Sequence, residues 1–231
     1  MKKTLVILLV AVLAVSLFVS CKSEPDSGKK GYTGDVYEIG ATGPGGGTVF
    51  YDVDADNDTG NADGLKADDC GWRYLEALKS DIDFNDQTKF YFGYNRTTAD
   101  GQNNMVGTIP EAGGDKIGAG KDNTDKLIAA MGPDAAFQSE NGSDKCAYYA
   151  ASIIYYFNSL EHDQFGKLDD WFLPSKEEAL KMVSVLNLTS NYWTSTESDN
   201  FGSKNAYAVS TKGIGEVSKA TAYAVRAVRR F

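Results

Sequence analysis

The chain has 231 residues, 42% hydrophobic and 24% charged, which is ordinary usage for a globular protein with a real core. Its 23 Lys and Arg residues against 32 Asp and Glu residues give a net charge of −9. This acidity repels phosphate backbones and excludes nucleic acid as a favoured partner. One histidine excludes His-rich metal sites, and three cysteines are too few for a disulfide-rich scaffold.

Residues 1–20 have the pattern of a signal peptide. Lys2 and Lys3 precede an apolar run from Leu5 to Val19 that is too short to span a bilayer comfortably. The run ends with a small residue directly before Cys21. This pattern resembles the lipobox of bacterial lipoproteins, although Phe18 stands where that motif usually has Leu. The alternative is an ordinary signal peptide followed by a chance cysteine.

The lipobox resemblance implies that Cys21 is lipidated and becomes the mature N-terminus. Acyl chains such as palmitate contribute about 0.8 kcal/mol per buried CH₂, so we expect a membrane anchor. Lys22 follows the cysteine where Asp would favour the inner membrane, so the resemblance implies the outer membrane or the cell surface. Removing the leader with its two lysines leaves 21 basic against 32 acidic residues, or −11.

Residues 21–35 are predicted to form a flexible tether after the lipidated cysteine, because Lys, Ser, Glu, Pro, Asp and Gly offer nothing to bury. The remaining residues, 36–231, are predicted to form one domain. It begins with a glycine turn at 43–47 and a strand at 48–53. A phosphate-binding loop is excluded because no Lys-Ser or Lys-Thr follows these glycines.

The middle of the domain combines loops with helices. Residues 72–78 are apolar and compatible with helix or strand, and 80–122 are predicted as long loops with one or two short strands. Asn123 is expected to cap a first helix. Helical spacing of apolar residues predicts a second helix over Asp144–Leu160. A third helix starts at a capping box in which Ser175 and Glu178 satisfy each other's backbone donors.

The C-terminal part changes to a period of two. Strands are predicted over 192–195, 206–209 and 223–228, with glycine turns at Gly202 and from Gly213 to Gly215. Helices in the middle and antiparallel strands at the end predict an α+β fold.

Six short motifs occur in order between about Ile39 and the C-terminus. They are the glycine turn with Phe50–Asp52, Gly71–Ala77, Ile117–Thr124, Asp170–Glu178, Tyr192–Glu197 and Val225–Phe231. Together they resemble a bacterial C-type-lectin-like domain family, the kind found at the C-terminus of Lcl-type adhesins. The resemblance implies a C-type-lectin-like fold with short helices, antiparallel strands and long loops. It also implies ligand display by loops on a compact scaffold, often on cell surfaces.

Two activities of similar folds are not implied. True C-type lectins bind sugar through calcium with Glu-Pro-Asn or Gln-Pro-Asp and Trp-Asn-Asp triplets. The nearest string here, Glu24-Pro25-Asp26, lies in the tether, and Trp193 is followed by threonine. Formylglycine-generating enzymes need a pair of redox cysteines near the C-terminus, and no cysteine follows Cys146.

An aspartate-rich segment is the candidate metal site. Its carboxylates stand at positions 1, 3, 5, 7 and 12 of an EF-hand-like loop, but the sixth-position glycine and the final glutamate are missing. We therefore favour a solvated acidic hairpin over a calcium site and expect no cofactor. The five residues are Asp52, Asp54, Asp56, Asp58 and Asp63.

Cys70 and Cys146 are the two thiols left after lipidation. In an exported protein such a pair most simply forms a disulfide, and closing this long loop contributes about 4 kcal/mol in the chain-entropy model. Two free buried thiols are one alternative. A catalytic Cys146 with His162 is another, but no cysteine-protease signature surrounds either residue.

Ligand contacts are sought among aromatic and basic residues. The three tryptophans (Trp72, Trp171 and Trp193) lie in the motifs above, so we expect core packing rather than a sugar-stacking platform. Loop aromatics are better candidates, as are the last two arginines, which could touch an anionic ligand such as a glycosaminoglycan. Arg226 is expected to pair with a carboxylate between strands. The candidate ligand-binding residues are Tyr91, Tyr94, Phe201, Arg229 and Arg230.

The leading hypothesis is a surface-anchored lipoprotein that binds a ligand, such as a host matrix protein or glycan, without catalysis. A structural envelope lipoprotein with no soluble ligand is the first alternative. An extracytoplasmic hydrolase or oxidoreductase is the second, and it needs a nucleophile–base pair that the sequence does not reveal.

Overall fold

The fold class is α+β, as predicted. The computed structural model describes residues 34–55, 65–93, 95–97, 103–105, 109–133, 137–138, 145–146, 148–160, 168–198 and 204–231. Within these ranges helices and strands are mixed, and the named strands pair antiparallel.

The first sheet joins the two ends of the domain. It has the order β1-β2-β10, with β1 at Thr48–Asp52, β2 at Tyr74–Ala77 and β10 at Val228–Arg230. The strand predicted at 48–53 is therefore confirmed, and the ambiguous segment 72–78 contains a strand. All four residues of β2 are buried because this strand lies between its two neighbours.

The second sheet is a meander of three consecutive strands. It contains β7 (Tyr192–Glu197), β8 (Asn205–Ser210) and β9 (Gly213–Ser218), in that order. The predicted glycine turn at 213–215 is wrong, because these residues continue the ladder with β8. The predicted strand at 223–228 is also largely wrong, since only Val228 of that segment belongs to a named strand.

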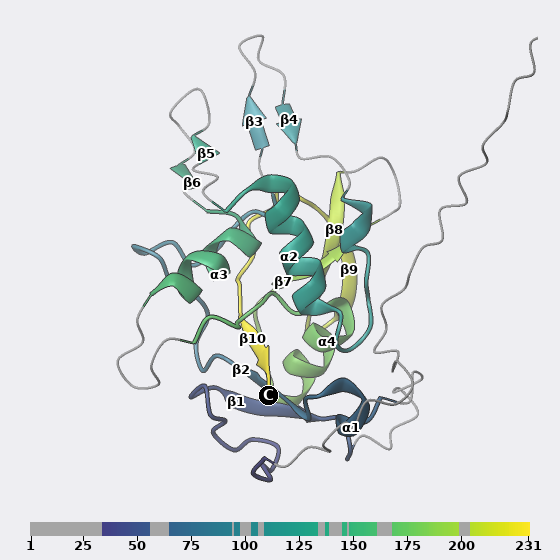
Figure 1. The fold of residues 1–231 in the computed structure, drawn as a ribbon. Coiled ribbons are helices and arrows are strands. Elements are labelled where there is room, and N and C mark those ends of the chain that lie inside the picture. Colours follow the sequence, from purple (N-terminus) through teal and green to yellow (C-terminus); the bar gives the residue numbers. More distant parts are fainter. Residues whose placement is uncertain are drawn as a thin grey trace, which may run out of the picture.

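The three longer helices lie between β2 and β7 in the chain (Figure 1). The remaining elements are α1 (Ala67–Cys70), the 3₁₀ helix η1 (Pro110–Ala112), α2 (Gly120–Met131), α3 (Ala150–Ser159), α4 (Lys176–Val185), and two hairpins. The hairpins are β3 (Asn95–Thr97) with β4 (Asn103–Met105), and β5 (Phe137–Gln138) with β6 (Lys145–Cys146).

Two helix starts differ from the prediction. The second helix begins at Ala150 rather than Asp144, because β6 pairs with β5 and uses the backbone of 145–146. The first begins at Gly120 rather than after Asn123. The Asn123 side chain instead accepts the N–H of Gly114 at 3.2 Å and donates to its carbonyl.

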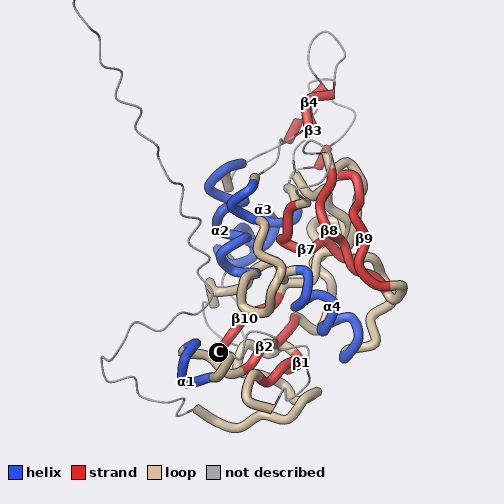
Figure 2. Tube along the Cα trace, turned by 90° about the vertical axis from the view of Figure 1, so that its right-hand side faces the viewer, coloured by secondary structure: helices blue, strands red, loops and turns tan. Residues whose placement is uncertain are grey.

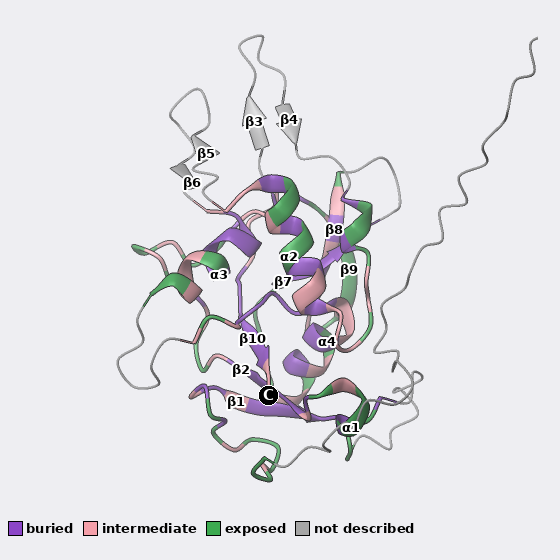
Figure 3. Cartoon of the chain, in the orientation of Figure 1, coloured by how far each residue is buried: buried purple, intermediate pink, exposed green. Residues whose placement is uncertain are grey.

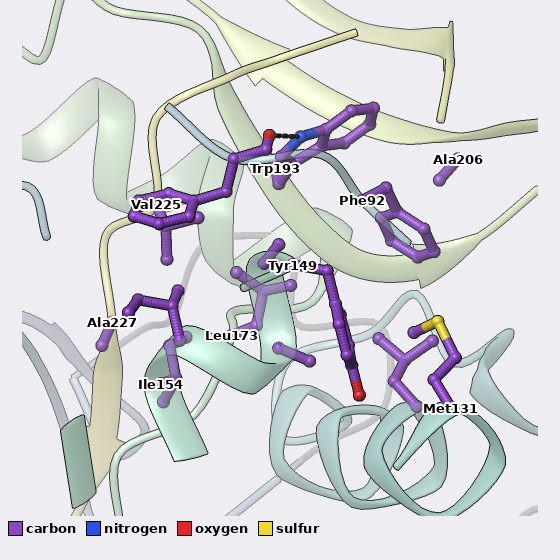
Figure 4. Packing of buried hydrophobic residues seen from close by; sticks show 14 of the residues in the cluster. Phe92, Met131, Tyr149, Ile154, Leu173, Trp193, Ala206, Val225 and Ala227 are labelled. Carbon is purple, nitrogen blue, oxygen red and sulfur yellow. Dashed lines mark hydrogen bonds between the residues drawn. The ribbon is translucent and has the colours of Figure 1, made fainter. Parts of the chain in front are cut away.

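Two clusters of buried side chains form the core. One includes Trp193, Phe92 and Tyr149, and the indole N–H of Trp193 donates to the Phe90 carbonyl at 2.7 Å (Figure 4). The other lies between the first sheet and α4. Trp72, Trp171 and Trp193 are only 4%, 3% and 0% exposed, which confirms that they pack in the core.

The described chain begins and ends on the same side of the molecule. The Tyr37 ring packs edge-on against Tyr74 and Phe231, with ring centroids 5.5 and 5.2 Å away. In Figures 1 and 2 the hairpin β3–β4 lies at the end of the molecule opposite β1. In the part of the chain that is described, no helix is long and apolar enough to cross a membrane.

Candidate functional site

The glycine turn at 43–47 encloses an internal carboxylate. Glu76, in the central strand β2, is fully buried. The N–H groups of Gly45 and Gly47 donate to its two oxygens at 2.8 and 2.9 Å. A Cβ on Gly45 would lie 2.6 Å from the Glu76 carboxylate, so a side chain does not fit there. The turn therefore binds a glutamate of its own chain.

Arg229 completes this arrangement from β10. Its guanidinium donates to Glu76 at 2.9 Å and, through Nε and Nη2, to both oxygens of Asp170 at 2.8 Å. Burial lowers the Arg229 pKa, but the hydrogen bonds to Asp170 and Glu76 outweigh it and raise the pKa above its usual value. Arg229 was a candidate contact for an anionic ligand. The structure corrects this, because the residue is buried and its donors are used by two carboxylates.

A second buried glutamate lies under the turn at 118–120. The carboxylate of Glu178 accepts the N–H groups of Gly118 at 2.8 Å and Ser175 at 2.7 Å. The Glu178 N–H in turn donates to the Ser175 hydroxyl at 3.3 Å, which confirms the predicted capping box. Burial raises the pKa of Glu178 to about 7, and the backbone donors of Ser175, Gly118 and Gly120 act against this shift.

Arg230 lies beside this second turn. One of its nitrogens is 3.5 Å from the Gly118 carbonyl, and its charge lowers the pKa of Glu178. The residue is half-buried, unlike its neighbour Arg229. Its contact with an anionic ligand stays a prediction.

Glu197 and Lys219 form a third buried arrangement. The Lys219 Nζ lies 2.8 Å from Glu197 Oε1, and the two side chains are 0% and 1% exposed. Burial raises the pKa of Glu197 to about 7, and burial lowers the pKa of Lys219. Sequence reasoning missed this pair, because a charged residue at the end of a strand usually points to solvent.

The backbone of Lys219 connects the ends of two loops. Its N–H donates to the Lys204 carbonyl at 2.9 Å, and its carbonyl accepts the Phe92 N–H at 3.3 Å. Phe92 precedes the β3–β4 hairpin, and Lys204 directly precedes β8. The residue that carries the buried ammonium group therefore joins, through its backbone, the segment before β3 to the residue before β8.

Tyr91 is the candidate ligand contact in this region that lies within the described residues. It is half-exposed, and its carbonyl accepts the N–H of Ala150, the first residue of α3, at 2.8 Å. This bond ties the segment before β3 to the helix. The candidates Tyr94 and Phe201 lie outside the described residues.

The two described members of the aspartate-rich segment make local contacts. Arg73 donates to both oxygens of Asp52 at 2.9 and 3.0 Å, and Asp54 accepts the N–H of Ala67 at 3.0 Å. These bonds connect the end of β1 to β2 and α1. In the described ranges no group of three or more His, Cys, Asp or Glu side chains could hold a metal. Asp56, Asp58 and Asp63 lie outside those ranges.

Of the three cysteines and the histidine, only Cys70 and Cys146 lie within the described residues. Cys21 and His162 lie outside the described residues. Cys70 ends α1, and Cys146 belongs to β6. These two elements lie at opposite ends of the domain in Figure 1, so the arrangement offers no support for a disulfide between them, which stays a prediction.

Arg226 was expected to pair with a carboxylate, and this is confirmed. Its Nε donates to Asp81 at 2.6 Å, and Nη1 donates to the Leu78 carbonyl at 2.7 Å. The residue is buried and fastens the segment before β10 to the one after β2.

Structural contacts account for the three buried glutamates described above. Backbone N–H groups and Arg229 hold Glu76, a helix cap holds Glu178, and Lys219 holds Glu197.

Compared with known proteins, the chain matches no protein-family model and no curated protein.

Proposed function

We propose that the chain is a lipid-anchored lipoprotein of the outer membrane or cell surface whose domain binds a ligand without catalysis. The proposal includes lipidation at Cys21, a tether over 21–35 and a C-type-lectin-like domain over 36–231. The lipobox-like end of the leader and the six ordered motifs of the domain support it. The α+β architecture is compatible with such a domain.

The observation that carries the proposal is where the tether joins the domain. The Tyr37 N–H donates to the Tyr74 hydroxyl at 3.1 Å, and the Tyr37 ring packs against Phe231. These contacts hold the start of the domain beside the first sheet. Because β3–β4 lies at the opposite end, an anchor at Cys21 would attach the domain by the end far from β3–β4 and leave that hairpin free to point away from the membrane (Figures 1 and 2). This attachment is compatible with a surface receptor.

A non-catalytic role fits the use of the buried charges. General acid–base catalysis needs a titratable group that reaches the substrate. Glu76, Glu178 and Glu197 are each closed off from solvent and engaged with neighbours of the fold. A structural role is therefore enough to explain why these three carboxylates are buried and bonded. Binding falls to residues that solvent can reach in part, such as Tyr91 and Arg230.

Anchoring is tested with a Cys21→Ser variant in cells. We expect the parent chain in the membrane fraction, labelled by a palmitate analogue and accessible to protease on intact cells. The variant should lose the label and the membrane association. A parent chain that stays soluble and unlabelled would contradict the anchor, and full protection from protease would contradict surface exposure.

Binding is tested with the purified Cys21→Ser chain on a panel of glycans, glycosaminoglycans and matrix proteins. For a ligand found on this panel, Tyr91→Ala and Arg230→Ala should each weaken binding by at least about fivefold, which corresponds to about 1 kcal/mol. Tyr155→Ala is the matched control, because Tyr155 is a 49% exposed tyrosine on α3. No binding across the panel would favour a structural envelope protein instead.

A further inference from the structure

The most exposed apolar side chains of the described residues lie where the domain begins. Val36 is 76% exposed and Ile39 is 50% exposed, the two highest values among the large hydrophobic residues of the described ranges. They stand three positions apart in one short segment. Single exposed apolar residues are normal on a globular domain, whereas a group of them marks a contact surface.

Two half-buried aromatic rings extend this apolar group. The Tyr37 ring, between Val36 and Ile39 in the chain, packs edge-on against Phe231 with ring centroids 5.2 Å apart. The segment is fixed to β1, since the Gly40 N–H donates to the Val49 carbonyl at 2.8 Å. We name these four apolar or aromatic side chains the entry surface: Val36, Tyr37, Ile39 and Phe231.

The entry surface lies at the end of the domain that faces away from the β3–β4 hairpin. In Figure 1 the segment before β1, coloured purple, forms the lower edge of the molecule, and Figure 2 shows the same segment below β1. Figure 3 draws much of it as exposed. This is the end at which the predicted tether joins the domain.

The length of the chain before the entry surface keeps it near an anchor at Cys21. Val36 lies 15 positions after Cys21. A chain of that length spans at most about 50 Å when fully extended, and about 20 Å on average as a random coil. An apolar contact that would be too weak between separate partners can form at this range, because tethering raises the effective concentration.

We propose that the entry surface contacts the lipid bilayer, with the Val36 and Ile39 side chains inserted into the headgroup layer. The inference rests on the proposed lipid anchor at Cys21 and adds a second contact with the same membrane. Aliphatic side chains gain free energy when they leave water, and tyrosine is favoured at membrane–water interfaces. The contact fixes the orientation of the domain, which a tether alone does not do.

Charge favours a lipid surface over a second copy of the chain. Asp35 and Glu38 are exposed and flank the apolar residues of the segment. Two entry surfaces placed face to face would bring these carboxylates together, on chains that each carry a net charge of −9. A zwitterionic lipid headgroup contains an ammonium group, which attracts carboxylates rather than repelling them.

The test places a fluorescent tryptophan in the entry surface. Purified, lipidated Ile39→Trp chain is incorporated into phosphatidylcholine vesicles whose acyl chains either carry bromine near the headgroup or do not. Bromine quenches tryptophan on contact, and the three native tryptophans are at most 4% exposed. We expect brominated lipid to lower the emission of Ile39→Trp relative to the parent chain. Tyr155→Trp, at a 49% exposed position on α3, should show no such loss.

A second variant separates insertion from mere proximity to the membrane. Val36→Asp replaces a 76% exposed side chain, so the fold is retained, but it puts a carboxylate into the inserted face. Added to Ile39→Trp, it should restore the emission to the level of Tyr155→Trp, and the chain should still float with the vesicles.

Two results would overturn the insertion and leave the anchor standing. One is unquenched Ile39→Trp in a chain that floats with the vesicles, and the other is quenching that persists with Val36→Asp. A lipidated preparation that does not float with the vesicles would overturn the anchor and the insertion together.

Discussion

Each of two glycine-rich turns donates backbone N–H groups to a buried glutamate, but the two carboxylates differ in what else they contact. At 43–47, Glu76 is also bonded to Arg229 at 2.9 Å. At 118–120, Glu178 receives backbone donors, and Arg230 affects it through its charge. The first turn therefore contains a buried ion pair, and the second contains a buried helix cap.

The difference shows what each kind of partner can do. Backbone donors are enough to orient a carboxylate, but burial without a bonded cation favours its neutral form. The pKa of Glu178 accordingly rises to about 7. Arg229 keeps its charge because two carboxylates raise its own pKa. We expect the first turn to depend on the ion pair and the second to depend on pH.

The largest effect is expected from Arg229→Ala. The change leaves the fully buried Glu76 without its cation, and breaking such a pair typically lowers the free energy of unfolding by about 3–5 kcal/mol. Urea denaturation of the Cys21→Ser chain measures it. Arg230→Ala is the matched control, and at this half-buried residue the loss should stay within about 1 kcal/mol. Equal losses would remove the distinction between the two turns.

Stability is expected to fall as the pH rises from 4.5 to 7. Burial raises the pKa of Glu178 from 4.5 to about 7, so the folded chain binds a proton that the unfolded chain has lost. The protonated Glu178 contributes on the order of 3 kcal/mol to the free energy of unfolding. This contribution is fully present below pH 4.5 and is lost as the pH rises through 7.

The matched variant for this pH dependence is Glu178→Gln. The pKa of Glu197 is also raised to about 7, so both residues give a slope of the same sign. Removing Glu178 should reduce that slope by about half in urea denaturation at a series of pH values. An unchanged slope would show that Glu178 stays ionised in the folded chain.

A smaller effect is expected from Gly47→Ala in the first turn. The added Cβ would lie 2.5 Å from the carbonyl oxygen of Ala77, a backbone atom that cannot move aside. Overpacking of this kind costs about 1–3 kcal/mol. Gly215→Ala is the control, because its Cβ meets nothing within 4 Å. Similar melting temperatures for the two variants would show that the turn relaxes around a side chain.

The smallest effect is expected from Lys116→Ala beside the second turn. Lys116 pairs with Glu177 at 2.9 Å, but its side chain is 48% exposed. Such a pair contributes at most about 1 kcal/mol and is weakened by salt. Denaturation at low and high salt measures it. A larger loss would mean that the surface pair, rather than the buried Glu178, stabilises this turn.

Local patterns were enough to predict part of this molecule. The cap formed by Ser175 and Glu178 depends on residues three apart, and β1, β7 and β8 follow from short apolar runs. The α+β class follows from the order of these elements. The Lcl-type resemblance and the anchor at Cys21 are also statements of sequence, and they remain proposals.

Other features depended on contacts between residues far apart in the chain. Arg229 looked like an exposed C-terminal arginine, but it meets Glu76 across 153 positions. Lys219 and Glu197 are 22 positions apart in the chain, and no local pattern indicates that they face each other in the interior.

The sequence by itself determined the helix cap, the main strands and the burial of the tryptophans, because propensity and periodicity act over a few residues. Only the tertiary structure decided which charges are buried. The desolvation of a carboxylate depends on every segment packed around it, and neighbours along the chain do not reveal those segments.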